Sequence, residues 1–245
     1  MSILSFSNVW VEYGENVVLE KVNLEVDAGS FVSVVGPSGA GKSTFLRLIV
    51  GQESPTRGQI YLDDKALPID PGPDRSIVYQ KYSVFPHLNV LENVLFGLEV
   101  AKSPILGRTF GKTRKDNIEI ATKMLESVGL GHSLKKYPQA LSGGMQQRLS
   151  IAQALVKNPK IMLLDEAFGA LDPGTKNDMH NLILDLWNEH NLTIIMVTHD
   201  IKEAFKLGTR LLSFDKRRID PQAPNRYGAT TVYDMPIKKP QKMPA

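Results

Sequence analysis

The sequence has 245 residues, of which 42% are hydrophobic and 22% are charged, with a formal net charge of +3 at pH 7 and no cysteine. This composition is that of an ordinary globular protein, which excludes a wholly disordered or collagen-like chain, and the small net charge gives no reason to expect a nucleic-acid partner. Without cysteine, disulfides, thiolate metal sites and cysteine nucleophiles are all excluded, which suits a reducing compartment.

Neither a membrane span nor a targeting segment is visible. The longest apolar stretches, such as residues 161–164 and 194–197, are far shorter than the about 20 apolar residues of a spanning helix. Residues 1–7 lack the basic start and the sustained apolar core of a secretory signal. We therefore expect a chain that does not itself cross a bilayer.

The first part of the chain predicts an antiparallel sheet edge, then a buried strand and a helix. Residues 1–30 and 57–65 have the pattern of short strands with turns. Residues 31–35 are continuously apolar, which is typical of a strand buried on both faces. A glycine-rich turn follows, and residues 42–50 have the apolar spacing of a helix that ends at Gly51.

The middle of the chain, from about residue 89 to 156, predicts helices and few strands. Asn89 and Glu92 have the spacing of a capping box, with asparagine as the cap. We interpret this segment as an α-helical subdomain inserted into an α/β core. One helical stripe within it is formed by Ile118, Ala121, Met124, Leu125 and Val128.

The second half of the core follows the helical segment. Residues 161–164 and 193–198 are apolar runs, which indicate parallel strands covered by helices on both faces. Between them, Asp172 and the proline after it are typical of an N-cap and the first turn of a helix. The predicted fold class is therefore α/β, with a parallel-sheet core built from residues 1–88 and 157–215.

Residues 216–245 form a basic, proline-containing C-terminal tail. The segment has seven basic and two acidic side chains, a local charge of +5, and five prolines. A solvated, partly disordered tail is the favoured interpretation. Contact with phospholipid headgroups or with a membrane-bound partner is the alternative.

A phosphate-binding loop is predicted between the strand at 31–35 and the helix after it. The pattern G-x-x-x-x-G-K-[ST] is matched, and glycines let the backbone curl so that successive N–H groups face phosphate oxygens. Lys42 should bridge the β- and γ-phosphates, and Ser43 should bind Mg²⁺ through its hydroxyl. A glycine turn that binds nothing fits this context poorly. The residues expected to contact the nucleotide are Gly36, Pro37, Ser38, Gly39, Ala40, Gly41, Lys42, Ser43 and Thr44.

Two carboxylates follow the apolar run at 161–164. Mg²⁺ prefers oxygen ligands and keeps several waters, so a single aspartate at a strand end, Asp165, suits it. Glu166 lies where it could polarise a water for attack on the γ-phosphorus. Acidic residues often follow buried strands, so this interpretation depends on the phosphate loop being part of the same sheet.

His199 follows the apolar run at 193–197, at the carboxyl edge of the predicted parallel sheet, where ligands bind in such folds. It could donate to the γ-phosphate and orient Glu166. No role is assigned to the remaining histidines, which are His87, His132, His180 and His190.

A second group of small residues, Ser142, Gly143 and Gly144, opens a predicted helix of the inserted subdomain. Exposed N–H groups at a helix N-terminus can bind an anion. On this pattern alone, a simple N-cap is the favoured alternative.

Together these segments resemble the ATP-binding subunit of ATP-binding cassette (ABC) transporters, over nearly the whole chain to about residue 215. The Ser-Gly-Gly element separates this family from other phosphate-loop ATPases. The resemblance implies a P-loop NTPase (RecA-like) fold and two subunits packed head to tail. Ser142, Gly143 and Gly144 of one subunit would then cover the γ-phosphate bound by the other.

The resemblance also implies roles that the pattern alone leaves open. Tyr13 would stack on adenine, with an ordinary strand aromatic as the alternative. Gln80 would contact Mg²⁺ or the attacking water, and Asp172 would cross the dimer interface. The implied catalytic residues are Glu166, His199, Lys42 and Gln80, and the implied Mg²⁺ ligands are Ser43, Gln80 and Asp165.

Residues 141–148 and 165–172 resemble bacterial importers of nitrate, sulfonate and taurine, and small nitrogen compounds such as urea or guanidine also fit. This resemblance implies an ATPase at the cytoplasmic face of the inner membrane, whose ATP-driven dimer closure powers a separate permease fed by a solute-binding protein. A soluble ABC ATPase of repair or assembly and an exporter subunit are the alternatives. For the unusually long and basic stretch at 101–115, a permease contact and a solvated loop both remain open.

Overall fold

The computed structural model describes residues 1–102 and 109–238, so residues 103–108 of the basic stretch and residues 239–245 of the expected tail lie outside the description. The strands are β1 (Ser2–Tyr13), β2 (Asn16–Asp27), β3 (Phe31–Val35), β4 (Arg57–Leu62), β5 (Lys65–Ala66), β6 (Arg75–Tyr79), β7 (Ile161–Asp165), β8 (Thr193–Val197), β9 (Arg210–Lys216) and β10 (Ala229–Pro236). The helices are α1 (Lys42–Val50), α2 (Val90–Lys102), α3 (Gly111–Ser127), α4 (Gly143–Leu155), α5 (Pro173–His190) and α6 (Ile201–Leu207), with 3₁₀ turns at Gly131–Ser133 and Pro138–Ala140. Within these residues, no helix combines the length and the apolar character that a membrane crossing requires.

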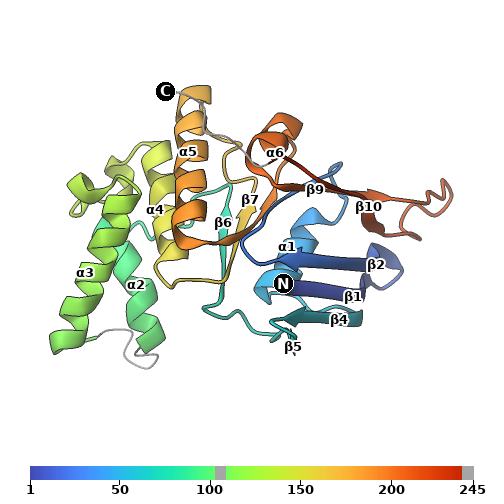
Figure 1. Cartoon of the computed structure of the whole chain (residues 1–245), viewed down its shortest axis with the longest axis horizontal. Coiled ribbons are helices and arrows are strands. Elements are labelled where there is room, and N and C mark those ends of the chain that lie inside the picture. The colour runs from blue at the N-terminus through green and yellow to red at the C-terminus, as the bar shows by residue number, and fades with distance from the viewer. Residues whose placement is uncertain (103–108, 239–245) are drawn as a thin grey trace.

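One ten-stranded sheet runs through the described chain in the order β5-β4-β1-β2-β10-β9-β3-β8-β7-β6. Strands β9, β3, β8, β7 and β6 pair in parallel, whereas β5, β4, β1 and β2 pair in antiparallel fashion. Figure 1 shows the antiparallel strands at one end of the molecule and α2, α3 and α4 grouped at the other. The predicted fold class, a parallel core with an antiparallel edge, is confirmed.

The segment after β9 differs from the expectation of a solvated tail. Strand β10 pairs with β9 along its whole length and touches β2 through the single pair Ala229 and Leu19, so it connects the two halves of the sheet. Residues 229–236 are therefore ordered as a strand, within the segment for which a solvated, partly disordered tail was expected. The sequence missed this strand because most of its side chains are polar or half-exposed, yet its backbone satisfies the open edge of β9.

The inserted segment consists of α2, α3, the two 3₁₀ turns and α4, and no strand interrupts it within the described residues. Its start is a reciprocal capping box, as predicted. The Asn89 N–H donates to Glu92 Oε2 at 3.0 Å, and the Glu92 N–H donates to Asn89 Oδ1 at 2.9 Å. These two bonds satisfy backbone donors that the first turn of α2 would otherwise leave unpaired.

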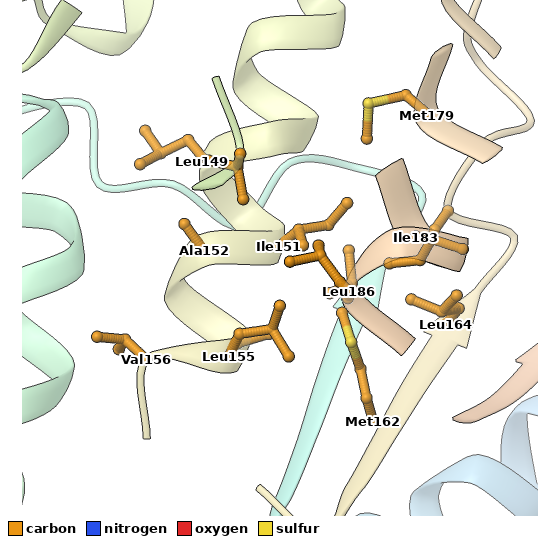
Figure 2. Packing of buried hydrophobic residues seen from close by; sticks show 14 of the residues in the cluster. Leu149, Ile151, Ala152, Leu155, Val156, Met162, Leu164, Met179, Ile183 and Leu186 are labelled. Carbon is orange, nitrogen blue, oxygen red and sulfur yellow. The ribbon is translucent and has the colours of Figure 1, made fainter. Parts of the chain in front are cut away.

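A hydrophobic cluster joins this helical segment to the sheet. Leu155 and Ile151 of α4 lie against Leu186 of α5 and Met162 of β7 (Figure 2), and all four are essentially inaccessible to solvent. Helix α5 therefore covers one face of the parallel strands while also packing on α4, and its buried residues include Met179, Ile183, Leu184 and Leu186.

Helix α1 is enclosed by the second hydrophobic cluster, between the antiparallel and parallel parts of the sheet. Seven of its nine residues are buried. The ring of Phe45 lies 5.0 Å from that of Phe6 and 4.9 Å from that of Phe214. Because α1 begins where the phosphate loop ends, this packing also fixes the loop.

Strand β6 was not predicted, because it starts with a charged side chain. Arg75 is only 4% exposed. Its guanidinium donates to the carbonyl oxygens of Asp70 at 2.9 Å and Ile49 at 3.2 Å, and pairs with Asp74 at 3.2 Å. These partners replace water, so the arginine can be buried and the strand can join the sheet at its edge.

Candidate functional site

The carboxyl ends of four parallel strands place most of the predicted site residues together. The phosphate loop follows β3, Gln80 follows β6, Glu166 follows β7, and His199 lies just beyond β8. Two cavities of about 480 and 500 Å³ lie at this edge and share Ser43 and Glu166 in their linings. The first is lined by Tyr13, Asn16, Val18, Ser38, Gly39, Gly41, Lys42, Ser43, Thr44, Arg47 and Glu166, and the second by Ser43, Tyr79, Gln80, Lys81, Ser83, Asp165 and Glu166.

The loop at 36–44 needs glycine at two positions for reasons of space. A Cβ on Gly36 would lie 2.2 Å from the carbonyl oxygen of Phe214. Gly41 has a φ of 71°, and a Cβ there would lie 2.6 Å from Leu19 Cδ2. The loop therefore lies directly against β2 and β9, so the curl that exposes its N–H groups is fixed by the sheet. Of the remaining loop residues, Pro37 presents its carbonyl to Lys42 and Ala40 is buried.

Lys42 is held inside the loop. Its Nζ donates to the carbonyl oxygens of Gly36 at 2.7 Å and Pro37 at 2.8 Å. Burial lowers the pKa of the Lys42 ammonium from its ordinary value, and the carboxylates of Glu166 and Asp165 oppose that shift. An anion entering the cavity would therefore meet a partly desolvated positive charge, which strengthens its attraction.

Asp165 and Glu166 bring two negative charges to the same edge. Burial, reinforced by the charge of Glu166, raises the pKa of Asp165, while Arg47 and Lys42 act in the opposite direction. A raised pKa means that ionised Asp165 lacks sufficient positive charge around it, so a bound cation would be favourable. The ligands available next to it, Ser43 and Gln80, supply oxygen atoms.

The backbone of Glu166 adopts a left-handed conformation, with φ at 48°, which is costly for a residue other than glycine. The Glu166 N–H donates to the Val197 carbonyl at 3.0 Å, and its carbonyl accepts from the Gly169 N–H at 3.0 Å. Neighbouring backbone therefore enforces the turn. It leaves Glu166 Oε2 3.5 Å from His199 Nδ1.

Tyr13 lies at the rim of the first cavity. Its side chain is 51% exposed, and its hydroxyl donates to Glu53. Its exposed ring thus lines a cavity that also contains Lys42, and stacking on adenine stays a prediction.

The residues expected to act across a dimer lie outside both cavities. None of the described lining residues is Ser142, Gly143, Gly144 or Asp172. Ser142 caps α4 by accepting from the Met145 N–H at 3.3 Å, and Asp172 caps α5 by accepting from the Thr175 N–H at 3.0 Å. Both helix starts are thus formed as predicted, away from the chain's own phosphate loop.

Arg47 is a site residue that sequence reasoning missed. It lines the first cavity, and its charge acts on the pKa of Asp165. The sequence signal that could have identified Arg47 is its position one helical turn after Ser43. Arg47 Nε donates to the Ser43 carbonyl at 3.5 Å.

Comparisons with known proteins show the family to which the whole chain is similar. The family model described as "ABC transporter" matches residues 19–169. The nitrate import ATP-binding protein NrtD of Synechocystis sp. is 41% identical over 218 residues, covering 89% of this chain and 78% of the relative. The bicarbonate transport ATP-binding protein CmpD of the same organism is 43% identical over 215 residues, covering 86% and 73%. The taurine import ATP-binding protein TauB of Escherichia coli O157:H7 is 41% identical over 210 residues, covering 86% and 78%.

Solved structures are similar as well. An ATP-binding cassette in a dimeric, post-hydrolysis state with bound ADP and phosphate has a TM-score of 0.73 and 30% identity, covering 96% of this chain and 99% of that one. A second cassette of an ABC transporter, in its ADP conformation, has a TM-score of 0.80 and 25% identity, covering 96% and 91%. With the family model spanning more than half of the sequence, the chain belongs to the ABC transporter family, as an ATP-hydrolysing cassette.

Proposed function

We propose that this protein is the ATP-hydrolysing subunit of an importer for a small solute. Its relatives named above import nitrate or taurine or transport bicarbonate, and sulfonates or small nitrogen compounds such as urea and guanidine remain candidates. The observation that carries the proposal is the convergence of Lys42, Asp165 and Glu166 at one sheet edge, beside a loop whose shape suits phosphate.

Each residue at that edge receives a role by its position. Lys42 pairs with the β- and γ-phosphates, and the N–H groups of residues 36–44 surround them. Ser43, Gln80 and Asp165 would hold Mg²⁺, which supplies positive charge to the phosphates. Tyr13 stacks on the adenine.

Glu166 polarises the attacking water, and His199 orients Glu166 and donates to the γ-phosphate. The 3.5 Å separation of His199 Nδ1 and Glu166 Oε2 supports this pairing. The turn that presents Glu166 is enforced by backbone hydrogen bonds, so the carboxylate needs little reorganisation before the reaction.

The second group of residues completes the site in a second copy of the chain. Helix α4 begins at Ser142, Gly143 and Gly144, and α5 begins at its N-cap Asp172. Neither helix start lines the chain's own cavities. In a head-to-tail dimer these helix ends meet the partner's nucleotide. ATP then joins two electropositive ends that would otherwise repel each other, and hydrolysis removes the γ-phosphate that holds them.

Dimer closure drives a permease through the helical subdomain, about residues 89–156. A groove of about 310 Å³ between β6, α2 and α4, with Phe85 and Phe96 in its lining, lies just beyond Gln80 and is the expected contact. The subunit then works at the cytoplasmic face of the bacterial inner membrane, and a solute-binding protein delivers the cargo on the other side.

Glu166→Gln tests the mechanism. The variant should bind ATP and Mg²⁺ but turn over at least about 100-fold more slowly, because a positioned general base contributes roughly 10²–10⁴-fold. It should also accumulate as a dimer in size-exclusion chromatography with ATP, and stay monomeric with ADP. Lys42→Ala is the control that should lose nucleotide binding. A monomeric Glu166→Gln variant at saturating ATP, with and without the permease, would contradict the dimer mechanism.

The solute is identified by reconstitution. The protein is combined with its co-purifying permease and solute-binding protein in liposomes, and ATPase activity is measured while nitrate, bicarbonate, taurine, urea and guanidine are added outside. One of these solutes should stimulate hydrolysis and be taken up. ATPase activity that never depends on an external solute would favour a soluble or export role instead.

A further inference from the structure

Glu203 is a buried carboxylate to which the mechanism above gives no role. It lies on α6, is only 5% exposed, and has three partners. Its Oε2 accepts from the Thr198 hydroxyl at 2.5 Å, and its Oε1 lies 2.8 Å from His180 Nε2 and 3.0 Å from Lys176 Nζ. A buried carboxylate costs free energy unless such donors compensate it, so this cluster is a specific arrangement and not a generic surface feature.

The charge of Glu203 is maintained by these partners. Burial acts to raise the pKa of Glu203, but the hydrogen bonds from His180, Thr198 and Lys176 together hold it below the ordinary glutamate value. The carboxylate can only accept, so His180 donates from Nε2. The ring centroids of His180 and Phe168 lie 5.3 Å apart, in an edge-to-face arrangement. Phe168 is two residues beyond Glu166, so the cluster also contacts the segment that carries the proposed base.

The cluster holds both neighbours of His199. Thr198 is bound through its hydroxyl to Glu203, and the same hydroxyl accepts from the Asp200 N–H at 3.1 Å. Asp200 Oδ2 accepts a hydrogen bond from Lys176 Nζ at 3.0 Å. Its Oδ1 accepts from the N–H groups of residues 202 and 203 and so caps α6. Lys176 itself lies on the first turn of α5, next to Thr175, whose N–H donates to the N-cap residue Asp172.

His199 depends on this support because its own ring is weakly held. Its side chain is 66% exposed, and within the described residues its ring has Glu166 as its only polar partner. The direction of the imidazole is therefore set by the backbone of residues 198–200, which the buried cluster fixes to α5 and α6.

We propose that Glu203, together with Lys176, is a positioning residue for ATP hydrolysis, which acts by fixing residues 198–200 so that His199 faces Glu166. The proposal rests on the roles proposed above for His199 and Glu166. It assigns to a buried cluster between α5 and α6 a function in catalysis beyond stabilising the fold.

The test uses steady-state ATPase measurements on the full-length protein with saturating Mg²⁺. Glu203→Gln removes the charge that faces Lys176 and one acceptor, while Thr198→Val removes the hydroxyl with almost no change in volume. Both variants should lower kcat about 10- to 100-fold and leave KM for ATP within about twofold, since misplacing a reacting group by about 1 Å can cost 10²-fold.

The chain offers a matched control at the same pair of helices. Lys206 of α6 donates to Asn177 Oδ1 of α5 at 2.9 Å, and neither side chain takes part in the hydrogen bonds and ion pairs described above for residues 198–200. Lys206→Ala should keep kcat near the wild-type value. An equal loss in Lys206→Ala would show that any contact between α5 and α6 matters, and would overturn the assignment to Glu203.

A double-mutant cycle with His199→Ala separates positioning from stability. If Glu203 acts through His199, Glu203→Gln should no longer lower kcat in the His199→Ala background, although it still lowers the urea midpoint of unfolding. The same loss of kcat in both backgrounds would refute the proposal. Glu166→Gln distinguishes a failure of the proposed catalytic site from a failure of the role of Glu203. Normal hydrolysis by Glu166→Gln would reject the proposed site. If Glu166→Gln is inactive but the effects of Glu203→Gln and His199→Ala on kcat are additive, only the role of Glu203 is rejected.

Discussion

Gly144 offers a test in which stability and catalysis respond differently to one methyl group. A Cβ at this position would lie 2.5 Å from Thr175 Cγ2, where α4 meets α5. The threonine cannot turn away cheaply, because β-branched side chains are stiff and its hydroxyl and N–H both bind Asp172. Gly144→Ala therefore forces the two helix starts apart.

The expected magnitude follows from two opposing terms. Overpacking of this kind costs about 1–3 kcal/mol, whereas alanine in place of glycine in a helix contributes about 1 kcal/mol. Gly144→Ala should thus destabilise the protein by up to about 2 kcal/mol. Thr175→Ser removes only the clashing methyl, so in that background the same substitution should become neutral or stabilising, with a coupling free energy of about 1–3 kcal/mol between the two sites.

Urea denaturation of the four proteins in this cycle, without nucleotide, measures the coupling. ATPase measurements on the same samples add a second readout. Because Gly144 is proposed to face the partner's nucleotide, activity should stay low in the double variant even when its stability is restored. A coupling below about 0.5 kcal/mol would refute the steric argument, and restored activity would show that the glycine serves helix packing alone.

Two further predictions concern the phosphate loop and the metal site. Phe45→Ala should lower the free energy of unfolding by about 3–5 kcal/mol in urea, because it empties a space between two aromatic rings, whereas Phe110→Ala, at a ring that is 69% exposed, should change it by less than about 0.5 kcal/mol. Asp165→Asn should abolish hydrolysis yet raise the thermal midpoint of the nucleotide-free protein at pH 7. The pKa of Asp165 is higher folded than unfolded, so its ionisation destabilises the folded state above that pKa. The gain should therefore shrink as the pH is lowered toward the ordinary aspartate value of about 3.9, and a gain that grows on acidification would contradict the sign.

Several parts of the fold and site followed from local pattern. The phosphate loop, with the apolar strand β3 before it and α1 after it, is specified within about twenty consecutive residues, since strand, turn and helix each have their own signal there. The capping box of α2 and the caps of α4 and α5 were predicted for the same reason. In each case the interacting groups are three or four residues apart, so the sequence alone contains the geometry.

Other features were decided only by the tertiary structure. Strand β10 has a polar, half-exposed sequence. It pairs with the preceding strand β9, and its contact with β2 joins it to a segment about 200 residues earlier in the chain. Arg75 can be buried because its guanidinium donates to the carbonyl of Ile49 on α1 and to that of Asp70 in the segment before β6. His180 could be given no role from the sequence, and its contact with Glu203 exists because α5 and α6 pack together. Pairing between distant segments depends on how the whole chain fills space, and no short stretch of sequence contains that information.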